Sequence, residues 1–120
     1  MGKPMKKLTM QMIPAIALAC SGQASAYVYC VGRISEILTE ASGAVMVLPT
    51  FRNDWLQVCN LTGPWKGVPV DVCKSWVGTL TTVRITQDLS MFYYDAESSC
   101  SSIPSYANAS SPGYIRISPP

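Results

Sequence analysis

Apolar and polar residues change their spacing once along this chain, within residues 70–94. The first part of that segment carries apolar side chains at steps of three and four residues, namely Cys73, Trp76, Leu80 and Val83. This spacing places them on one face of a helix, and the preceding Pro69 suits a first helical turn. We therefore expect a helix that begins just after Pro69 and buries Trp76, Leu80 and Val83.

The helical spacing ends at Thr86-Gln87-Asp88, and a β-prone run follows. Residues Leu89 to Tyr94 include three consecutive aromatic residues at the end of the run. Aromatic residues are enriched in strands, so the run predicts a strand. Met91 and Tyr93 are expected to face the core.

Residues upstream of the helix alternate in the manner of strands. Three runs bounded by turn residues predict an antiparallel meander, and they are Tyr27 to Leu38, Ala44 to Leu48 and Trp55 to Leu61. The apolar side of the first run changes partway, and Gly32 marks a place where a bulge would form easily. Downstream, Asp95 to Ser111 is a long polar loop, and Gly113 to Ser118 predicts a last strand.

The first 26 residues have the organisation of a secretory signal peptide. Lys3, Lys6 and Lys7 precede an uncharged stretch from Leu8 to Ala19, and Ala24-Ser25-Ala26 offers small residues to a signal peptidase. The stretch is too short for a transmembrane helix, which needs about 20 apolar residues. Cleavage after Ala26 predicts a secreted or periplasmic protein with no membrane anchor. The alternative is lipoprotein processing at Cys20, because Ala17-Leu18-Ala19-Cys20 resembles a bacterial lipobox.

Cleavage changes the charge of the protein. Three of the nine basic residues would leave with the signal peptide, so six would remain beside seven acidic residues, which is a net charge of −1. The mature chain has no cluster of Lys or Arg that could pair with phosphates, so nucleic acid is excluded as the expected partner.

Residues 27–120 are enough for one domain with a modest core, which usually needs additional stabilisation. Four cysteines remain in this exported chain, and an even number in that setting predicts disulfides: Cys30, Cys59, Cys73 and Cys100. A zinc site is the alternative, but the chain has no histidine and no C-x-x-C pair. We expect no metal and no cofactor.

The predicted order is β-β-β-α-β-β, mainly β with one helix, which is the chain order of the OB-fold, a small five-stranded barrel. Over most of Arg33 to Tyr94 the chain also resembles the exported B subunits of AB5 toxins of the subtilase and pertussis type. Cys59, Cys73, Trp76 and the run Met91-Phe92-Tyr93-Tyr94 carry this resemblance. It implies a glycan-binding oligomer, but no sugar-site motif matches, so no binding residue is carried over. The chain also resembles short exported proteins of gammaproteobacteria.

The expected OB barrel selects one of the three pairings that four cysteines allow. In that barrel the first and fourth strands pair antiparallel, which brings Cys30 beside the segment that contains Cys100. The third strand leads directly into the helix, so Cys59 and Cys73 bracket one connection. We therefore predict the disulfides Cys30–Cys100 and Cys59–Cys73.

Catalysis has little support in the sequence. Without histidine, the common general base and the Ser-His and Cys-His nucleophile arrangements are absent. Asp95 and Glu97 lie two residues apart and would share a face of an extended strand, as a glycosidase pair must, but acidic pairs are common on solvated surfaces. We expect no enzyme.

Aromatic residues outside the helix are the candidates for binding. Trp65 lies between turn residues, Trp55 begins a strand and Tyr106 lies in the long loop, so each could offer a ring to a glycan or a protein. The sequence thus predicts a small disulfide-bonded binding module, either a homo-oligomer or a protein that docks through its loops. The alternative is a monomeric structural or inhibitory periplasmic protein, and measuring the size of the particle would separate the two.

Overall fold

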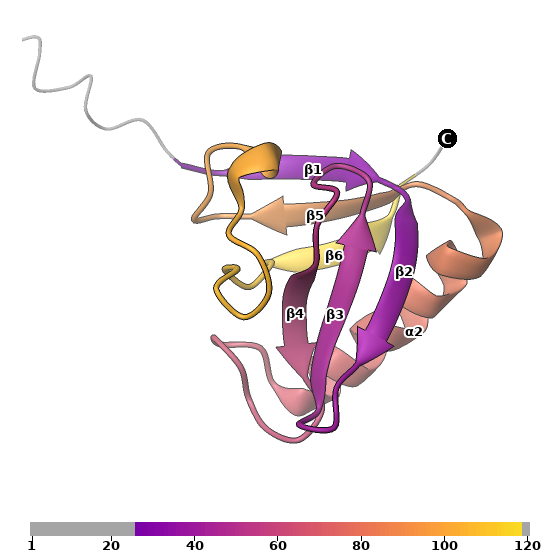
Figure 1. Cartoon of the computed structure of the whole chain (residues 1–120), viewed down its shortest axis with the longest axis vertical. Helices are drawn as coiled ribbons and strands as arrows, with labels where there is room; N and C mark the ends of the chain where they lie inside the picture. The colour runs from indigo at the N-terminus through magenta and orange to yellow at the C-terminus, as the bar shows by residue number, and fades with distance from the viewer. Residues whose placement is uncertain (1–25, 119–120) are drawn as a thin grey trace, which may run out of the picture.

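The computed structural model describes residues 26–118 (Figure 1). Six strands and one α-helix follow the predicted order, with the first predicted strand divided in two, and a short 3-10 turn lies in the long loop. The elements are β1 (Val28–Gly32), β2 (Ile34–Thr39), β3 (Ala44–Pro49), β4 (Leu56–Asn60), α2 (Val70–Thr86), β5 (Ser90–Tyr94), the 3-10 turn η1 (Cys100–Ser102) and β6 (Tyr114–Ile117). The predicted signal peptide and Cys20 lie outside the described residues.

The strands form two antiparallel sheets of three strands each. One sheet has the order β1-β5-β6 and the other β2-β3-β4. Figure 1 shows the strands of the two sheets running across one another, with α2 beside β2. The protein is thus mainly β with one helix, and the described strands do not close into a barrel.

The predicted strand from Tyr27 to Leu38 is divided at Arg33, because its two halves pair in different sheets. Gly32 allows this change of sheet. A Cβ atom at residue 32 would lie 2.6 Å from Thr50 Oγ1 and 3.1 Å from the Phe51 backbone nitrogen. The Arg33 amide donates to that same hydroxyl at 3.0 Å, and the Thr50 amide donates to the Arg33 carbonyl at 2.9 Å. The glycine therefore lets the strand pass against the loop after β3.

The helix has the bounds and the buried face that its spacing predicts. Cys73, Trp76, Leu80 and Val83 are buried. The helix ends where Gln87 takes a left-handed conformation and its amide donates to the Val83 carbonyl at 2.9 Å. Thr81 and Thr82 fit the helix because their hydroxyls donate to carbonyls one turn back, at 2.7 and 3.0 Å. No helix in residues 26–118 has the length and apolarity needed to cross a membrane.

The expectation that Met91 and Tyr93 face the core is wrong. Alternate residues of β5 are buried, namely Ser90, Phe92 and Tyr94, whereas Met91 and Tyr93 are half-buried on the opposite face. Cys30 lies opposite Phe92 in the register and also points inward. With period-two alternation, that inward pair sends Met91 and Tyr93 to the outer face of the sheet.

Both disulfides have the predicted pairing. Cys30 and Cys100 have Cα atoms 5.6 Å apart, and Cys59 and Cys73 have Cα atoms 5.5 Å apart. The first links β1 to η1 in the long loop, and the second links β4 to the first turn of α2. The four cysteines are therefore paired with one another, and the zinc alternative is excluded for them.

Candidate functional site

The outer face of the β1-β5-β6 sheet carries a row of tyrosines that crosses all three strands. Tyr29 lies opposite Tyr93, and Tyr93 lies opposite Tyr114. Two residues further along, Val31, Met91 and Arg116 form a second row in the same register. We call this surface the tyrosine face, and its members are Tyr27, Tyr29, Val31, Met91, Tyr93, Tyr114 and Arg116.

The rings of the tyrosine face pack against one another. The Tyr93 ring is stacked on Tyr114, with centroids 5.2 Å apart and planes 15° apart, and it also contacts Tyr29 at 5.2 Å. Tyr27 adds an edge-to-face contact with Tyr29 at 6.0 Å. Tyr93 thus lies between two neighbours, while Tyr29 and Tyr114 are exposed at the two ends of the row. Cross-strand aromatic pairs of this kind stabilise the sheet and hold the rings in place.

This face is unusually apolar for an exposed sheet surface. Tyr29 is 52% exposed and Tyr114 is 40% exposed, and Val31 in the second row is exposed as well. A contiguous exposed apolar patch on a small protein usually marks a contact surface. Loss of hydration raises the pKa of the Tyr93 phenol, and the nearby Asp95 carboxylate raises it further. The hydroxyl of Tyr93 therefore stays protonated at neutral pH and can both donate and accept hydrogen bonds.

Two charges lie at opposite ends of the tyrosine face. Arg116 is exposed in the second row, where its Nε donates to Met91 Sδ at 3.5 Å. Asp95 is exposed just beyond the end of β5, two residues after Tyr93. Its carboxylate is close enough to raise the pKa of the Tyr93 phenol. The face therefore has a positive end and a negative end with the tyrosine row between them.

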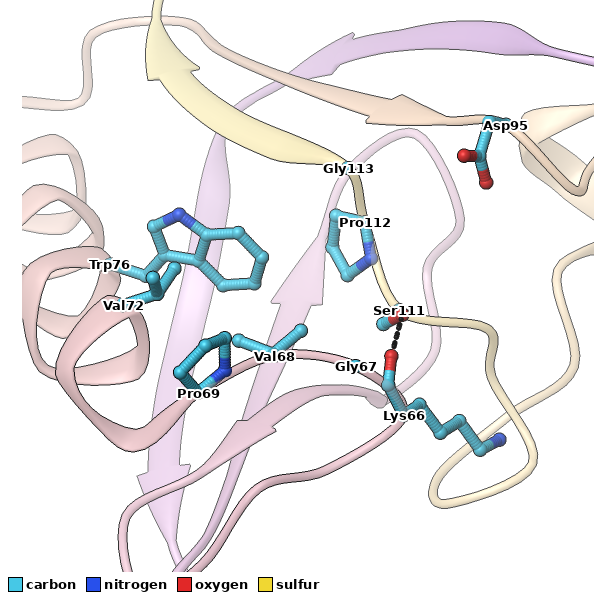
Figure 2. Close-up of a pocket in the computed structure, with 10 residues that line it drawn as sticks. All are labelled: Lys66, Gly67, Val68, Pro69, Val72, Trp76, Asp95, Ser111, Pro112 and Gly113. Atoms are coloured by element: carbon cyan, nitrogen blue, oxygen red, sulfur yellow. Dashed lines mark hydrogen bonds between the residues drawn. The ribbon is translucent and has the colours of Figure 1, made fainter.

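A cavity of about 310 Å³ adjoins this face beside the start of β6 (Figure 2). Figure 2 shows a bowl of apolar side chains, with the Trp76 ring on one side and Pro112 on the other. Gly113 joins the cavity to the tyrosine face, because it lines the cavity and also contacts the Tyr93 ring. The lining residues are Lys66, Gly67, Val68, Pro69, Val72, Trp76, Asp95, Ser111, Pro112 and Gly113.

Two of the polar residues that line this cavity already bond within the protein. The Lys66 ammonium donates to the carbonyls of Ala107 at 3.0 Å and Ala109 at 2.6 Å, and Figure 2 shows its side chain pointing away from Trp76. The Ser111 hydroxyl donates to the Lys66 carbonyl at 2.7 Å. Asp95 supplies the carboxylate among the lining residues, and its oxygens can accept hydrogen bonds.

The three aromatic residues that the sequence proposes for binding lie around the long loop and not on the tyrosine face. Trp65 is half-buried, and its ring lies 4.9 Å from the Lys66 ammonium. Trp55 is half-buried, and its carbonyl accepts from the Tyr106 amide at 2.7 Å. Tyr106 is 50% exposed. Trp65 and Trp55 thus help to hold the loop, and Tyr106 is the one with most of its ring free.

The long loop is also held by a polar cluster in the connection between β3 and β4. The Ser105 hydroxyl donates to the Asp54 carboxylate, and the Arg52 Nε donates to the Ile103 carbonyl at 2.8 Å. The hydrogen bond from Ser105 holds the pKa of Asp54 below its usual value. We attribute these contacts to anchoring of the long loop.

Asp95 and Glu97 do not share a face. Glu97 accepts from the Ser110 hydroxyl at 2.8 Å, and its charge raises the pKa of the inward Tyr94. The charge of Asp95 instead raises the pKa of the outward Tyr93. The strand ends at Tyr94, so alternation does not continue to residue 97. Within residues 26–118, no three His, Cys, Asp or Glu side chains are grouped so that they could hold a metal ion.

The tyrosine face is the feature that the sequence analysis missed. Tyr27 and Tyr29 alternate around the start of β1, which is a signal for one face of a strand. Tyr114 joins them only through the register of β6 with β5, and a single sequence does not contain that register.

Comparison of the chain with models of protein families, with curated proteins and with solved structures finds no match.

Proposed function

We propose that this protein is a small exported binding module that docks on a protein surface through its tyrosine face. The observation that carries the proposal is the exposed row of Tyr29, Tyr93 and Tyr114 across a sheet whose inner face is the core. Tyrosine is enriched at protein interfaces because its ring buries apolar area while its hydroxyl bonds at the edge of the contact. The rings are also held by one another, so binding would cost little side-chain entropy.

A protein ligand suits this face better than a sugar that stacks on it. A sugar needs a free aromatic side, and both sides of the central Tyr93 ring are covered by its neighbours. The net charge of −1 after signal cleavage gives no reason to expect nucleic acid.

The scaffold proposed for this function is an open OB-like barrel. In its support, β1 continues into β2 across the single residue Arg33, and α2 separates the third and fourth predicted strands. A parallel bridge between Leu56 and Tyr106 joins β4 to the segment that leads to β6. That bridge lies where an OB barrel would close.

The proposed location is the periplasm or the medium. The two disulfides fit a protein outside the cytoplasm. The signal sequence ending at Ala26 supplies the route.

A second candidate function is glycan binding in the Trp76 cavity. An aromatic ring and a carboxylate in the lining of one cavity are a combination that can bind a sugar ring, and here Trp76 and Asp95 both line the cavity. This candidate would agree with the resemblance to AB5 toxin B subunits. A glycan array with the mature protein and the Asp95→Asn variant tests it, and binding that the variant loses would support it.

Photo-crosslinking in exporting cells tests docking on the tyrosine face. A photoreactive residue placed at Val31 should give a discrete crosslinked protein, and the same residue at Lys74 on the exposed side of α2 should not. Replacing Tyr29 and Tyr114 together by Ser should abolish the product, whereas Tyr106→Ser, a change at an equally exposed tyrosine, should leave it intact. Absence of any Val31 product would favour the alternative, a structural or inhibitory protein without a partner on this face.

A further inference from the structure

The tyrosine face is complementary to itself. Arg116 and Asp95 are charged residues at its two ends, and the surface between them consists of tyrosines, a valine and a methionine. An isologous contact places the same patch on both partners, and when its twofold axis runs across the strands, each end of the patch meets the other end.

The sheet register gives the position of each group under a twofold axis. Faces can meet only about an axis that lies in the interface, parallel to the sheet. With the axis along the row of Tyr29, Tyr93 and Tyr114, each ring faces the same ring of the other copy, and the two ends of the strands exchange places. Arg116 lies beside Met91, two residues before Tyr93 on β5, and Asp95 lies two residues after it. Along the strand direction, Arg116 and Asp95 thus each lie about 7 Å from the row of Tyr93, on opposite sides of it. Arg116 on β6 therefore meets the end of the second copy that carries Asp95, one strand away on β5, where it can pair with the carboxylate.

We propose that the occupant of the tyrosine face is a second copy of this chain, packed face to face about that twofold axis. The inference rests on the proposed function, because it names the partner of the surface assigned there. Two symmetric Arg116 to Asp95 contacts would set the orientation, and the tyrosine rows would supply the buried apolar area.

The size of the face indicates a weak dimer. Seven side chains on one three-stranded sheet are fewer than the roughly 20 to 30 residues that each partner contributes to a standard interface. We therefore expect association in the micromolar range or weaker, with monomer and dimer exchanging rapidly.

Sedimentation velocity of the mature chain over a series of concentrations tests the proposal. The wild type should convert from monomer to dimer as concentration rises. Replacing Tyr29 and Tyr114 by Ser should abolish the dimer. Arg116→Glu and Asp95→Arg should each weaken association about tenfold, because each puts like charges together at two symmetric places.

The charge-swapped double variant, Arg116→Glu with Asp95→Arg, is the sharpest test. It restores an opposite charge pair at both places and should recover association to within about threefold of the wild type. Arg84→Glu, at an exposed arginine on α2, should have no effect. Disulfide mapping and circular dichroism of each variant would show that it is folded.

Two results would overturn the dimer. One is a wild type that stays monomeric at every concentration, and the other is a dimer that the tyrosine and charge variants leave unchanged. The Val31 crosslink separates this failure from failure of the proposed function. A monomeric protein that still crosslinks to a different protein at Val31 keeps the docking function and loses the homodimer, whereas a monomer without a crosslink loses both.

Discussion

The ring of Tyr93 lies directly against the backbone of Gly113. A Cβ atom at residue 113 would come within 2.8 Å of Tyr93 Cδ2, and the Gly113 amide donates to the Tyr93 carbonyl at 2.7 Å. An aromatic ring over a glycine on the neighbouring strand is a known way of covering an exposed glycine in a sheet. Here it connects the tyrosine face to the Trp76 cavity, since Gly113 belongs to the wall of both.

Replacement of Gly113 by Ala should therefore disturb the tyrosine face. The Tyr93 ring is held between Tyr29 and Tyr114 and has little room to move, so we expect a loss of about 1 to 2 kcal/mol in the free energy of unfolding. Urea denaturation followed by tyrosine fluorescence measures this loss.

Gly78→Ala is the matched control for this prediction. Gly78 is in the interior of α2, and an added methyl group would meet no atom within 4 Å. Because alanine favours a helix over glycine, this variant should gain about 0.5 to 1 kcal/mol. Equal stability changes of the same sign in the two variants would contradict the packing of Tyr93 on Gly113.

The sequence predicted the elements whose patterns are local. The spacing of Cys73, Trp76 and Leu80 reports one face of a helix without reference to the rest of the chain, and it identified α2 correctly. The pairing of the cysteines followed from the order of elements, because each disulfide joins segments that the order brings together. These predictions needed no knowledge of strand register.

The sequence failed where the register decides the outcome. The run Met91 to Tyr94 is apolar on both faces, so alternation alone does not tell which side is buried. The division of the first strand depends on the close approach of Thr50 to Gly32, a contact between residues far apart in the sequence. Predicting the tyrosine face requires knowing which alternate residues of β5 face outward and how β6 pairs with β5.

Lys66 should stabilise the long loop through its ammonium group. It donates to the carbonyls of Ala107 and Ala109 and lies over the Trp65 ring, so Lys66→Met removes charge-assisted hydrogen bonds and a cation–π contact. We expect a loss of about 1 kcal/mol in unfolding free energy and faster amide exchange in residues 105–110.

Lys74→Met provides the comparison for Lys66. Lys74 is an exposed residue of α2, so its replacement should change stability by less than about 0.5 kcal/mol. Hydrogen exchange monitored by mass spectrometry would show whether the loop is affected in one variant alone. Equal exchange in both variants would mean that the lysine does not hold the loop.

Export should produce a mature chain that begins at Tyr27. The small residues of Ala24-Ser25-Ala26 set this cleavage site. Mass spectrometry of protein recovered from the periplasm or the medium measures the mature mass directly. A chain that begins at a lipid-modified Cys20 would refute the prediction and would place the protein on a membrane surface.

Reduction of the disulfides should bring the protein close to unfolding. On the chain-entropy model, a link across 14 residues contributes roughly 3 kcal/mol and a link across 70 residues roughly 4 kcal/mol. Paired replacement by Ala of Cys59 with Cys73, or of Cys30 with Cys100, should therefore lower the denaturation midpoint strongly. Non-reduced peptide mapping of the wild type should recover the same two links, and a peptide joining Cys30 to Cys59 would contradict the topology.

Tyr94 should make the protein less stable at high pH. Its hydroxyl is buried and has no hydrogen-bond partner among the described residues, and burial, with a smaller contribution from Glu97, raises the pKa of the phenol well above 10. Above about pH 10 the unfolded chain loses this proton while the folded chain keeps it, so the folded state becomes less stable as pH rises. Urea denaturation of the mature protein from about pH 8 to about pH 12, two units either side of the ordinary phenol pKa of about 10, measures the decline.

The Tyr94→Phe variant isolates the contribution of this hydroxyl. Removing a buried polar group without a partner should leave stability at neutral pH unchanged or raise it by up to about 1 kcal/mol. The same variant should lose most of the decline above pH 10, because it removes the phenol whose pKa burial raises most, and only the smaller upward shift of Tyr93 remains. Tyr106→Phe, at a tyrosine that is 50% exposed, should keep the wild-type decline. If Tyr94→Phe also declined like the wild type, then the buried hydroxyl would not be its cause, and the tyrosines of the outer face would be the next groups to replace.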